Sequence, residues 1–224
     1  MRVGIVGAGR IGGNVGIQLG RSGHEVLFSY SRDPAKLEQL AAEAQGARTG
    51  TPREAVEFGE AVVFAVPWRL IDDVLHQTGP LDSKVVVDTT NPFGPRGLEE
   101  LPGGLSAVET NARRMPGAML AKAFNTLTAG YQRDVAEGRV DGDVAMFFAA
   151  REQAAIDAAE TLIEGCGFVP VHLGGWERVR LMEAPRRPGS VYGEAYRSED
   201  GRRIAAAPLD EAARLADELK IEDE

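Results

Sequence analysis

The chain opens with a short apolar run that leads directly into a glycine-rich loop, and this junction constrains the fold more than any other feature. Residues 2–6, RVGIV, have the composition of a buried strand. Gly7, Gly9 and Gly12 follow in G-x-G-x-x-G spacing, and apolar residues then recur at helical spacing over 11–19. A strand, a glycine turn and a helix in this order are typical of the βαβ unit that binds a dinucleotide.

Each glycine of the loop has its own predicted role. Gly7 permits a tight turn after the strand, Gly9 lets the backbone approach a pyrophosphate, and Gly12 lets the helix pack closely on the sheet. The free N–H groups at the start of the helix then face the phosphates. The simpler interpretation is a glycine turn that only joins the strand to the helix.

Short apolar and β-branched runs alternate with helical patterns along most of the chain. Near-continuous apolar strands separated by helices indicate a parallel sheet that helices cover on both faces. With right-handed crossovers this predicts an α/β fold, a Rossmann-like doubly wound and mainly parallel sheet. We therefore expect a dinucleotide-binding domain over 1–150 and a small C-terminal extension over 151–224. The expected strands after the first are 24–30, 48–49, 61–66, 84–90, 119–126, 143–150 and 167–174, and the helices include 34–44, 51–58, 152–163 and the tail from 208.

The end of the second expected strand carries basic and hydroxyl groups where many dinucleotide-binding chains place an acid. An Asp or Glu there accepts hydrogen bonds from the adenosine ribose and selects NAD. This chain instead has Ser31 and Arg32, with Lys36 one helical turn further on, and Asp33 is better explained as a helix cap. A guanidinium, a hydroxyl and an ammonium would hold a 2′-phosphate, so we expect NADP(H) rather than NAD(H). The alternative is that Arg32 and Lys36 are solvated surface charges.

Two further expected strands end in residues that could meet a ligand. Ligands of open α/β sheets lie beyond the carboxyl ends of the strands. Pro67 and Trp68 are therefore placed to flank the adenine or a ribose, and Asn91 is placed to hydrogen-bond the cofactor. Trp68 could equally be a packing residue, and Asn91-Pro92 could be a simple turn.

The composition narrows the class of protein. The formal net charge of the 224 residues is −9, so a nucleic-acid partner, whose phosphates would be repelled, is not expected. Cys166 is the only cysteine, which excludes an intramolecular disulfide and fits a cytoplasmic setting. We expect no signal peptide, no membrane span and no metal site, because the sequence lacks the patterns of each. The partner is therefore expected to be a small molecule.

Several motifs taken together resemble a known family. The segments MRVGIVGAGRIGG, YSRDPAK, FAVPW, DTTNP, AKAFNT and GGWERVRLMEA are similar to those of coenzyme F420-dependent NADP oxidoreductases and their relatives, which include the cytosolic domains of six-transmembrane metalloreductases. The resemblance covers about residues 1–184. The chain departs from the family pattern at Arg10-Ile11, where a Thr-Gly pair is frequent, and again after Ala184.

The resemblance implies an NADPH-binding domain, a C-terminal portion that helps to form a second-substrate pocket, and hydride transfer between the nicotinamide and coenzyme F420, a deazaflavin. Such transfer needs little acid–base help, and the sequence identifies no catalytic residue. Carried over by position, the resemblance assigns the 2′-phosphate to Ser31, Arg32 and Lys36, the pyrophosphate to Gly9, Arg10, Ile11 and Gly12, the length of the cofactor to Val66 and Pro67, and the nicotinamide end to Ala123, Phe124 and Asn125.

Residues 185–207 are rich in Gly, Pro and Arg and show no periodicity, which suggests a loop, a hairpin or a mobile segment. Arg186 and Arg187 could reach a polyanionic tail of a deazaflavin, or could belong to a flexible surface loop. Tyr192 and Tyr196 could pack across the interface of a homodimer formed by the C-terminal portion. The alternative functions are NADPH-dependent reduction of flavin, ferric ion or a small imine or carbonyl, and NADPH binding without turnover.

Overall fold

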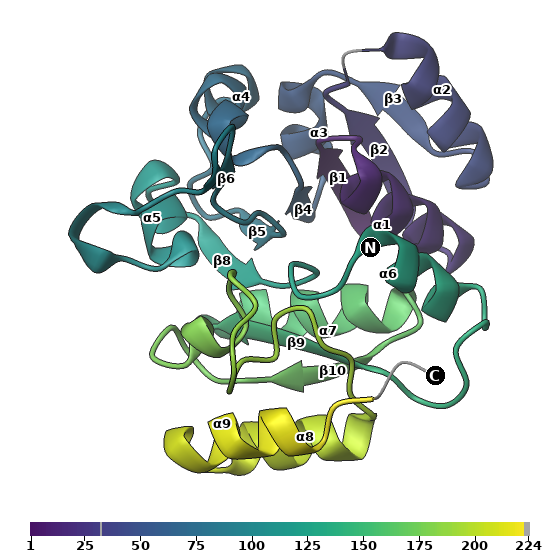
Figure 1. The fold of residues 1–224 in the computed structure, drawn as a ribbon. Coiled ribbons are helices and arrows are strands. Elements are labelled where there is room, and N and C mark those ends of the chain that lie inside the picture. The colour runs from purple at the N-terminus through teal and green to yellow at the C-terminus, as the bar shows by residue number, and fades with distance from the viewer. Residues whose placement is uncertain (32, 222–224) are drawn as a thin grey trace.

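The strands of this protein form one large sheet and one small hairpin. The computed structural model describes residues 1–31 and 33–221. The large sheet contains β1 (Arg2–Val6), β2 (Glu25–Ser29), β3 (Arg48–Gly50), β4 (Ala61–Phe64), β5 (Val85–Asp88), β8 (Met119–Lys122), β9 (Ala145–Ala150) and β10 (Val169–His172), and the hairpin pairs β6 (Phe93–Gly94) with β7 (Gly97–Leu98). The strand order is β10-β9-β8-β5-β4-β1-β2-β3 (Figure 1).

The strand order places a topological switch at β1. This strand lies between β2 and β4, so the chain winds outward in both directions from it. In open α/β sheets, ligands bind beyond the carboxyl ends of the strands at such a switch. The glycine loop that follows β1 is therefore at the position where a ligand is expected.

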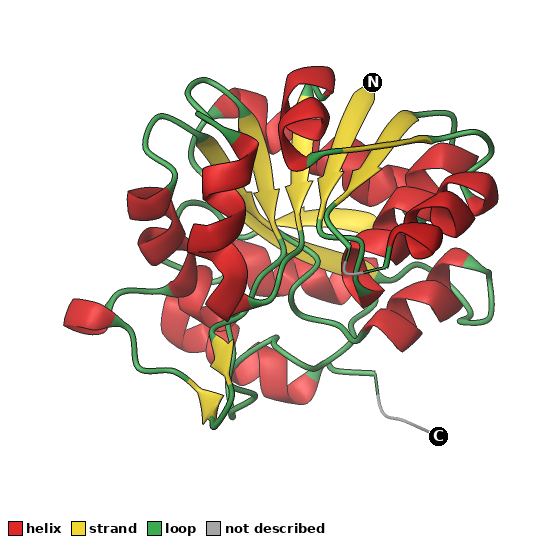
Figure 2. Ribbon diagram, turned by 90° about the horizontal axis from the view of Figure 1, so that it is seen from above, coloured by secondary structure: helices red, strands yellow, loops and turns green. Residues whose placement is uncertain are grey.

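Helices cover both faces of the sheet (Figure 2). The N-caps of two helices follow the sequence signals, because Asp33 accepts a hydrogen bond from Ala35 N at 3.0 Å and Thr51 forms a capping box with Glu54. The helices are α1 (Arg10–Arg21), α2 (Pro34–Glu43), α3 (Pro52–Phe58), α4 (Ile71–Thr78), α5 (Ala107–Arg114), α6 (Ala129–Ala136), α7 (Gln153–Gly165), α8 (Ser198–Ala206) and α9 (Leu209–Glu218), with short 3₁₀ turns η1 (Trp68–Leu70), η2 (Pro102–Gly104) and η3 (Val179–Leu181).

The hydrophobic core consists of two layers, one on each face of the sheet. Val63 of β4 faces the layer that contains residues of α1, α2 and α7, whereas its neighbour Phe64 faces the layer built with α3, α4, α5, α8 and α9. Successive residues of a strand point to opposite faces, so strands that are apolar throughout need cover on both sides. The predicted Rossmann-like, doubly wound α/β fold is confirmed.

The strands β9 and β10 run antiparallel to the rest of the large sheet. β9 pairs antiparallel with β8 through Ala121 and Ala150, and β10 pairs parallel with β9. The sheet is thus mainly parallel, as predicted, with a reversal near one edge.

The C-terminal region differs from the sequence prediction in one element. Residues 198–206 form α8, which packs on β9 and β10, so the interpretation of 185–207 as a structureless segment is wrong there. Gly201 weakens the helical signal in the sequence, yet it is buried, and a Cβ on it would lie 2.8 Å from the Cβ of Ala145. Helix α8 therefore needs a glycine to approach the sheet closely.

The burial of Tyr196 in the core was also not predicted from the sequence. Its ring is fully buried and meets Phe147 edge to face at a centroid distance of 5.5 Å. Its hydroxyl donates to the carbonyl oxygen of Ala216 at 2.7 Å. Tyr196 thus packs inside its own chain and is not available to an interface with a second copy.

Candidate functional site

Two of the three loop glycines are required by the protein's own packing. Gly7 has a φ of +108°, and a Cβ on it would lie 2.5 Å from the carbonyl oxygen of Ala65. A Cβ on Gly12 would lie 2.0 Å from the carbonyl oxygen of Gly7. Gly9 differs, since its Cβ would meet no described atom closer than 4.0 Å. The missing side chain of Gly9 therefore leaves open space in front of α1.

The start of α1 fits a diphosphate. Gly9 occupies its N-cap position and offers no side chain to the first N–H groups. No acidic residue stands in the first turn of this described helix. The N-terminus of a helix carries a partial positive charge and unpaired donors, which bind phosphate when no side chain satisfies them.

A cavity of about 260 Å³ lies beside the glycine loop, where the carboxyl ends of β1, β2 and β4 meet. Gly7, Gly9, Ser31, Lys36 and Pro67 line it. The structure thus brings together loop, hydroxyl and ammonium groups that the sequence assigned to one end of a dinucleotide. Arg32, which the sequence assigned to the same end, lies outside the described residues.

Arg69 adds a second cation to this cavity, and sequence reasoning missed it. It lies on η1 and lines the same cavity as Lys36, which lies on α2. Its side chain is exposed, and within the described chain it has no hydrogen-bond or ion-pair partner. Arg69 could have been found from the sequence, because it follows Pro67 at the end of a predicted strand.

The backbone at the end of β2 is bent toward the glycine loop. Tyr30 has a φ of +58°, which is uncommon for a residue with a side chain. This conformation aims its carbonyl oxygen at Ala8, whose N–H donates to it at 3.1 Å. Strained residues of this kind cluster at ligand sites.

A second cavity, of about 440 Å³, lies at the other end of the loop. It is bounded by Arg10 and Ile11 on the loop side and by Asn91 and Asn125 at the ends of two strands. The side chain of Asn91 donates to the backbone oxygen of Asn125 at 3.0 Å, so the two are fixed together. Phe124, which the resemblance assigned to the nicotinamide end, also lines this cavity. The other lining residues had no such assignment, and they are Thr89, Thr126, Leu127, Thr128, Ala129, Arg186, Tyr192 and Gly193.

Two predicted residues are not brought into these cavities. Val66 and Ala123 are buried among core residues and line neither of them. Phe124 is fully buried with a φ of +58°, and its carbonyl oxygen accepts from the buried side chain of Gln132 at 3.0 Å. Gln132 therefore holds the loop after β8, a role with no signal in the sequence.

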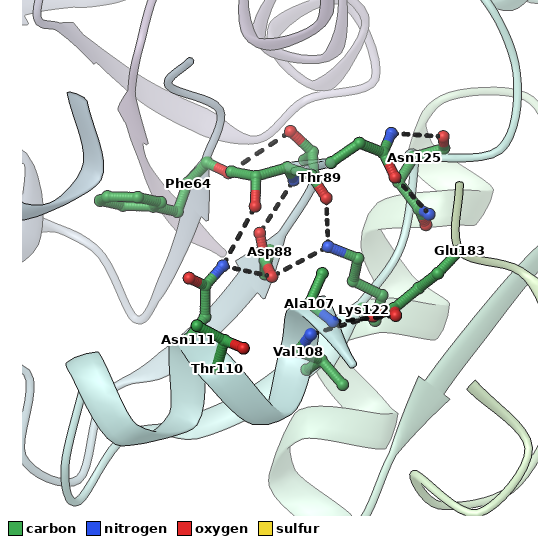
Figure 3. A network of polar contacts seen from close by, with 12 residues as sticks. Phe64, Asp88, Thr89, Ala107, Val108, Thr110, Asn111, Lys122, Asn125 and Glu183 are labelled. Carbon is green, nitrogen blue, oxygen red and sulfur yellow. Dashed lines mark hydrogen bonds and ion pairs between the residues drawn. The ribbon is translucent and has the colours of Figure 1, made fainter. Parts of the chain in front are cut away.

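A buried ion pair supports the strand end that carries Asn91 (Figure 3). Lys122 Nζ lies 3.0 Å from Asp88 Oδ2, and neither side chain is exposed to solvent. Asp88 Oδ1 accepts from the N–H of Thr90 at 2.8 Å, while Lys122 donates to the carbonyl oxygen of Thr90. Asn111 of α5 donates to Asp88 Oδ2 at 2.9 Å. The ion pair thus fixes both backbone polar groups of Thr90, the residue that immediately precedes Asn91.

The same network reaches the C-terminal region through Met182 and Glu183. Asn125 donates to the carbonyl oxygen of Met182 at 2.7 Å. The buried carboxylate of Glu183 accepts from Ala107 N and Val108 N, both at 2.9 Å, and so caps α5 (Figure 3). A carboxylate at a helix N-terminus is stabilised by the free N–H groups there. These three hydrogen bonds anchor the start of the segment that carries Arg186 and Tyr192.

Trp68 is a packing residue. Its side chain is only 4% exposed, and the guanidinium of Arg114 lies 4.6 Å from its ring centroid. It does not line the cavity that Pro67 and Arg69 share. Of the two roles left open by the sequence, packing is therefore the one that the structure supports.

Among the described residues, no cluster of His, Cys, Asp or Glu could hold a metal ion. No helix in residues 1–31 and 33–221 combines the length and apolarity that crossing a membrane requires.

Solved structures share this fold over most of the chain. A hypothetical protein from Sinorhizobium meliloti is 27% identical, with a TM-score of 0.72 over 84% of this chain and 91% of that chain. A protein from Arthrobacter sp. FB24 described as a "putative F420 dependent NADP-reductase" is 24% identical, with a TM-score of 0.67 over 80% and 86%. A reductive aminase from Aspergillus terreus, solved with NADPH and ethyl levulinate, is 18% identical, with a TM-score of 0.57, and the match covers 78% of this chain but 55% of the aminase.

Sequence comparison adds a family match in the first part of the chain. No curated protein matches the sequence. Residues 2–92, which contain the glycine loop, Ser31, Lys36 and Asn91, match the family model described as NADP oxidoreductase, coenzyme F420-dependent. The resemblance predicted from the motifs is thereby confirmed, and residues 2–92 are related to the NADP-dependent oxidoreductases of this family.

Proposed function

We propose that this protein binds NADP(H) and transfers hydride between the nicotinamide and a deazaflavin, coenzyme F420. The observation that carries the proposal is the 440 Å³ cavity in which the glycine loop, the strand-end residues Asn91 and Asn125, and the C-terminal segment meet. Nicotinamide supplies a hydride at C4 when it is bound. The protein's task is to hold two rings together and to exclude water.

The adenosine end of the cofactor is proposed to occupy the smaller cavity. Lys36 and Arg69 supply positive charge from two sides and Ser31 supplies a hydroxyl, a donor set that suits a 2′-phosphate. Asp33 is the acid in this cavity, and its carboxylate is engaged by the N–H of Ala35. The reductive aminase that shares the fold has NADPH bound, which supports the same cofactor here.

The second ring is proposed to enter from the side of Arg186 and Tyr192. A further cavity of about 600 Å³ includes Pro92, next to Asn91, and is lined by Arg180 and Arg187. Glu99 and Glu100 also line it, so an anionic tail would lie beside the arginines and away from the glutamates. The name of the Arthrobacter protein and that of the family model support a deazaflavin as the partner.

The test is direct mixing of the purified protein with NADPH and coenzyme F420. We expect the absorbance of oxidised F420 to fall as NADPH is consumed in equal amount, and the reverse reaction to occur with reduced F420 and NADP⁺. The Gly9→Ala variant should bind NADPH weakly and serve as a folded, inactive control. NADPH binding by the wild type without any change in either chromophore would refute the proposal.

A further inference from the structure

The 440 Å³ cavity has one lining side chain that can act as a Brønsted acid. Its polar lining residues are Thr, Asn, Arg10, Arg186 and Tyr192. Thr hydroxyls and Asn amides are far weaker acids than a phenol, and Arg keeps its proton. Among the described residues that line the cavity, Tyr192 is therefore the one available Brønsted acid.

Tyr192 is held in place by its backbone and not by its hydroxyl. The N–H of Val191 donates to Leu181 O at 2.7 Å, and the N–H of Gly193 donates to Thr126 O at 2.8 Å. The ring is partly buried, and its hydroxyl has no hydrogen-bond partner in the described chain. Because Tyr192 lines the cavity and its hydroxyl has no internal hydrogen bond to break, the phenol is available to a bound molecule.

Burial keeps the phenol of Tyr192 neutral. Burial raises the pKa of Tyr192 above its ordinary value. The carbon chain of Arg186 packs beside Gly193, but its guanidinium is paired with Glu194 at 2.6 Å. Arg10 lines the same cavity. At neutral pH the hydroxyl therefore carries its proton.

We propose that Tyr192 is the catalytic proton donor of a carbonyl reductase activity, in which this site reduces small aldehydes or ketones with an apolar body. The inference uses the proposed binding of NADPH but not that of F420. Hydride from the nicotinamide forms a C–H bond at the carbonyl carbon while the C=O π bond breaks. The oxygen takes the proton of Tyr192, NADPH becomes NADP⁺, the carbonyl becomes an alcohol, and the phenolate recovers a proton from water.

The apolar part of the substrate is proposed to contact Ile11, Leu127 and Ala129, which line the cavity. A tricyclic ring acceptor does not require Tyr192, since the charge that arrives with the hydride spreads over the ring and solvent can supply the proton. A carbonyl group has no such delocalisation, and its alkoxide forms readily only when an acid is in contact with it. The position of Tyr192 therefore indicates an acceptor that localises charge on one atom.

The test compares wild type with Tyr192→Phe, with 4-nitrobenzaldehyde or coenzyme F420 as acceptor. We expect the variant to lose about 100-fold or more in kcat with the aldehyde, the usual contribution of a general acid. Its Kd for NADPH should stay within about twofold, on the order of 0.4 kcal/mol. Tyr196→Phe is the matched control, since that hydroxyl lies in the core.

Two further measurements do not depend on the variant's turnover. Ultraviolet titration of the unliganded protein should show one tyrosine fewer, with a raised pKa, in Tyr192→Phe than in wild type. Wild-type aldehyde reduction should also show a solvent deuterium isotope effect that F420 reduction lacks. Turnover of F420 with no aldehyde reduction by wild type would overturn this inference and leave the deazaflavin proposal standing. Aldehyde reduction that depends on Tyr192, with no F420 turnover, would support the inference and refute the deazaflavin proposal.

Discussion

Lys122 and Asp88 are the last residues of neighbouring parallel strands, lie opposite each other in register, and form an ion pair of 3.0 Å from which solvent is excluded. Asp88 also holds the N–H of Thr90, and Lys122 holds its carbonyl group. A buried pair of this kind compensates the cost of desolvating two charges only while both partners are present. The effects of this ion pair on the stability of the protein and on the position of Asn91 can be measured.

We expect Asp88→Asn to lower the free energy of unfolding by about 3 to 5 kcal/mol, because Lys122 would remain buried without its counter-charge. Urea denaturation followed by circular dichroism measures this change. Asp134→Asn is the matched control, since Asp134 pairs with Arg139 at the surface and exposed pairs contribute about 0 to 1 kcal/mol. Equal losses in the two variants would show that the buried pair has no special role.

Gly9 and Gly12 should respond differently to the same added methyl group. Gly12→Ala places a Cβ against the carbonyl oxygen of Gly7, so we expect a loss of about 1 to 3 kcal/mol in stability. Gly9→Ala has open space and a φ of −77°, so its stability should change by less than about 0.5 kcal/mol. Its Kd for NADPH should nevertheless rise by about tenfold or more, or 1.4 kcal/mol, because the methyl group occupies the approach of the pyrophosphate.

Fluorescence titration with NADPH and urea denaturation of both glycine variants test this prediction. Unchanged NADPH affinity in a folded Gly9→Ala protein would place the pyrophosphate elsewhere.

Lys36 and Arg69 are expected to determine the choice between NADPH and NADH. Loss of a charge-assisted hydrogen bond to a phosphate costs about 1.5 to 3 kcal/mol. Lys36→Ala and Arg69→Ala should therefore each raise the Kd for NADPH by about 10- to 100-fold and leave the Kd for NADH within about twofold. Arg202→Ala, on α8 at the far end of the sheet, controls for the change in net charge (Figure 1). A parallel loss of affinity for both nucleotides in Arg69→Ala would mean that Arg69 contacts the adenine instead of the 2′-phosphate.

Glu183 is expected to affect the binding of the second substrate and not the binding of the nucleotide. Glu183→Gln removes the charge that caps α5 and should cost about 1 to 3 kcal/mol of stability. Because Glu183 begins the segment that carries Arg186, the KM for F420 should also rise while the Kd for NADPH stays constant. Glu109→Ala removes the capping box that Glu109 forms with Ser106 on the same helix, and should change stability without changing the KM. An unchanged KM in Glu183→Gln would remove this positioning role.

Cys166 is expected to be unreactive in the native protein. Its side chain is 4% exposed, and burial raises the pKa of its thiol, so the nucleophilic thiolate is scarce. A thiol reagent should therefore modify Cys166 only as fast as the chain unfolds, and at once in concentrated urea. Rapid modification in native buffer, measured by mass spectrometry, would contradict the packing between α1 and α7.

Much of the nucleotide-binding half could be predicted because local signals and tertiary structure agree there. The strand, glycine turn and helix at the N-terminus specify one another through spacing alone, and residues 2–92 carry the family match. Asp33 and Thr51 could be recognised as caps because a cap acts on N–H groups two or three residues away. Short-range geometry of this kind can be predicted from the sequence alone.

The second half was less predictable because its roles depend on residues far apart in the chain. The run 143–150 indicates a buried strand, but an apolar run contains no information on direction, and β9 lies antiparallel to β8. Helix α8 was not predicted because a glycine such as Gly201 disfavours a helix. Its close approach to Ala145, which requires a glycine, is visible only in the structure.

The sequence by itself determined the doubly wound fold, the glycine loop and the polar residues at the carboxyl ends of the strands, since periodicity and turn chemistry act over a few residues. Only the tertiary structure decided that Arg69 and Lys36 line one cavity, that Glu183 caps a helix 75 residues earlier in the chain, and that Tyr192 and Asn91 line another. These relationships arise from the close packing of distant segments, where the free energy of each contact depends on neighbours that no local pattern specifies.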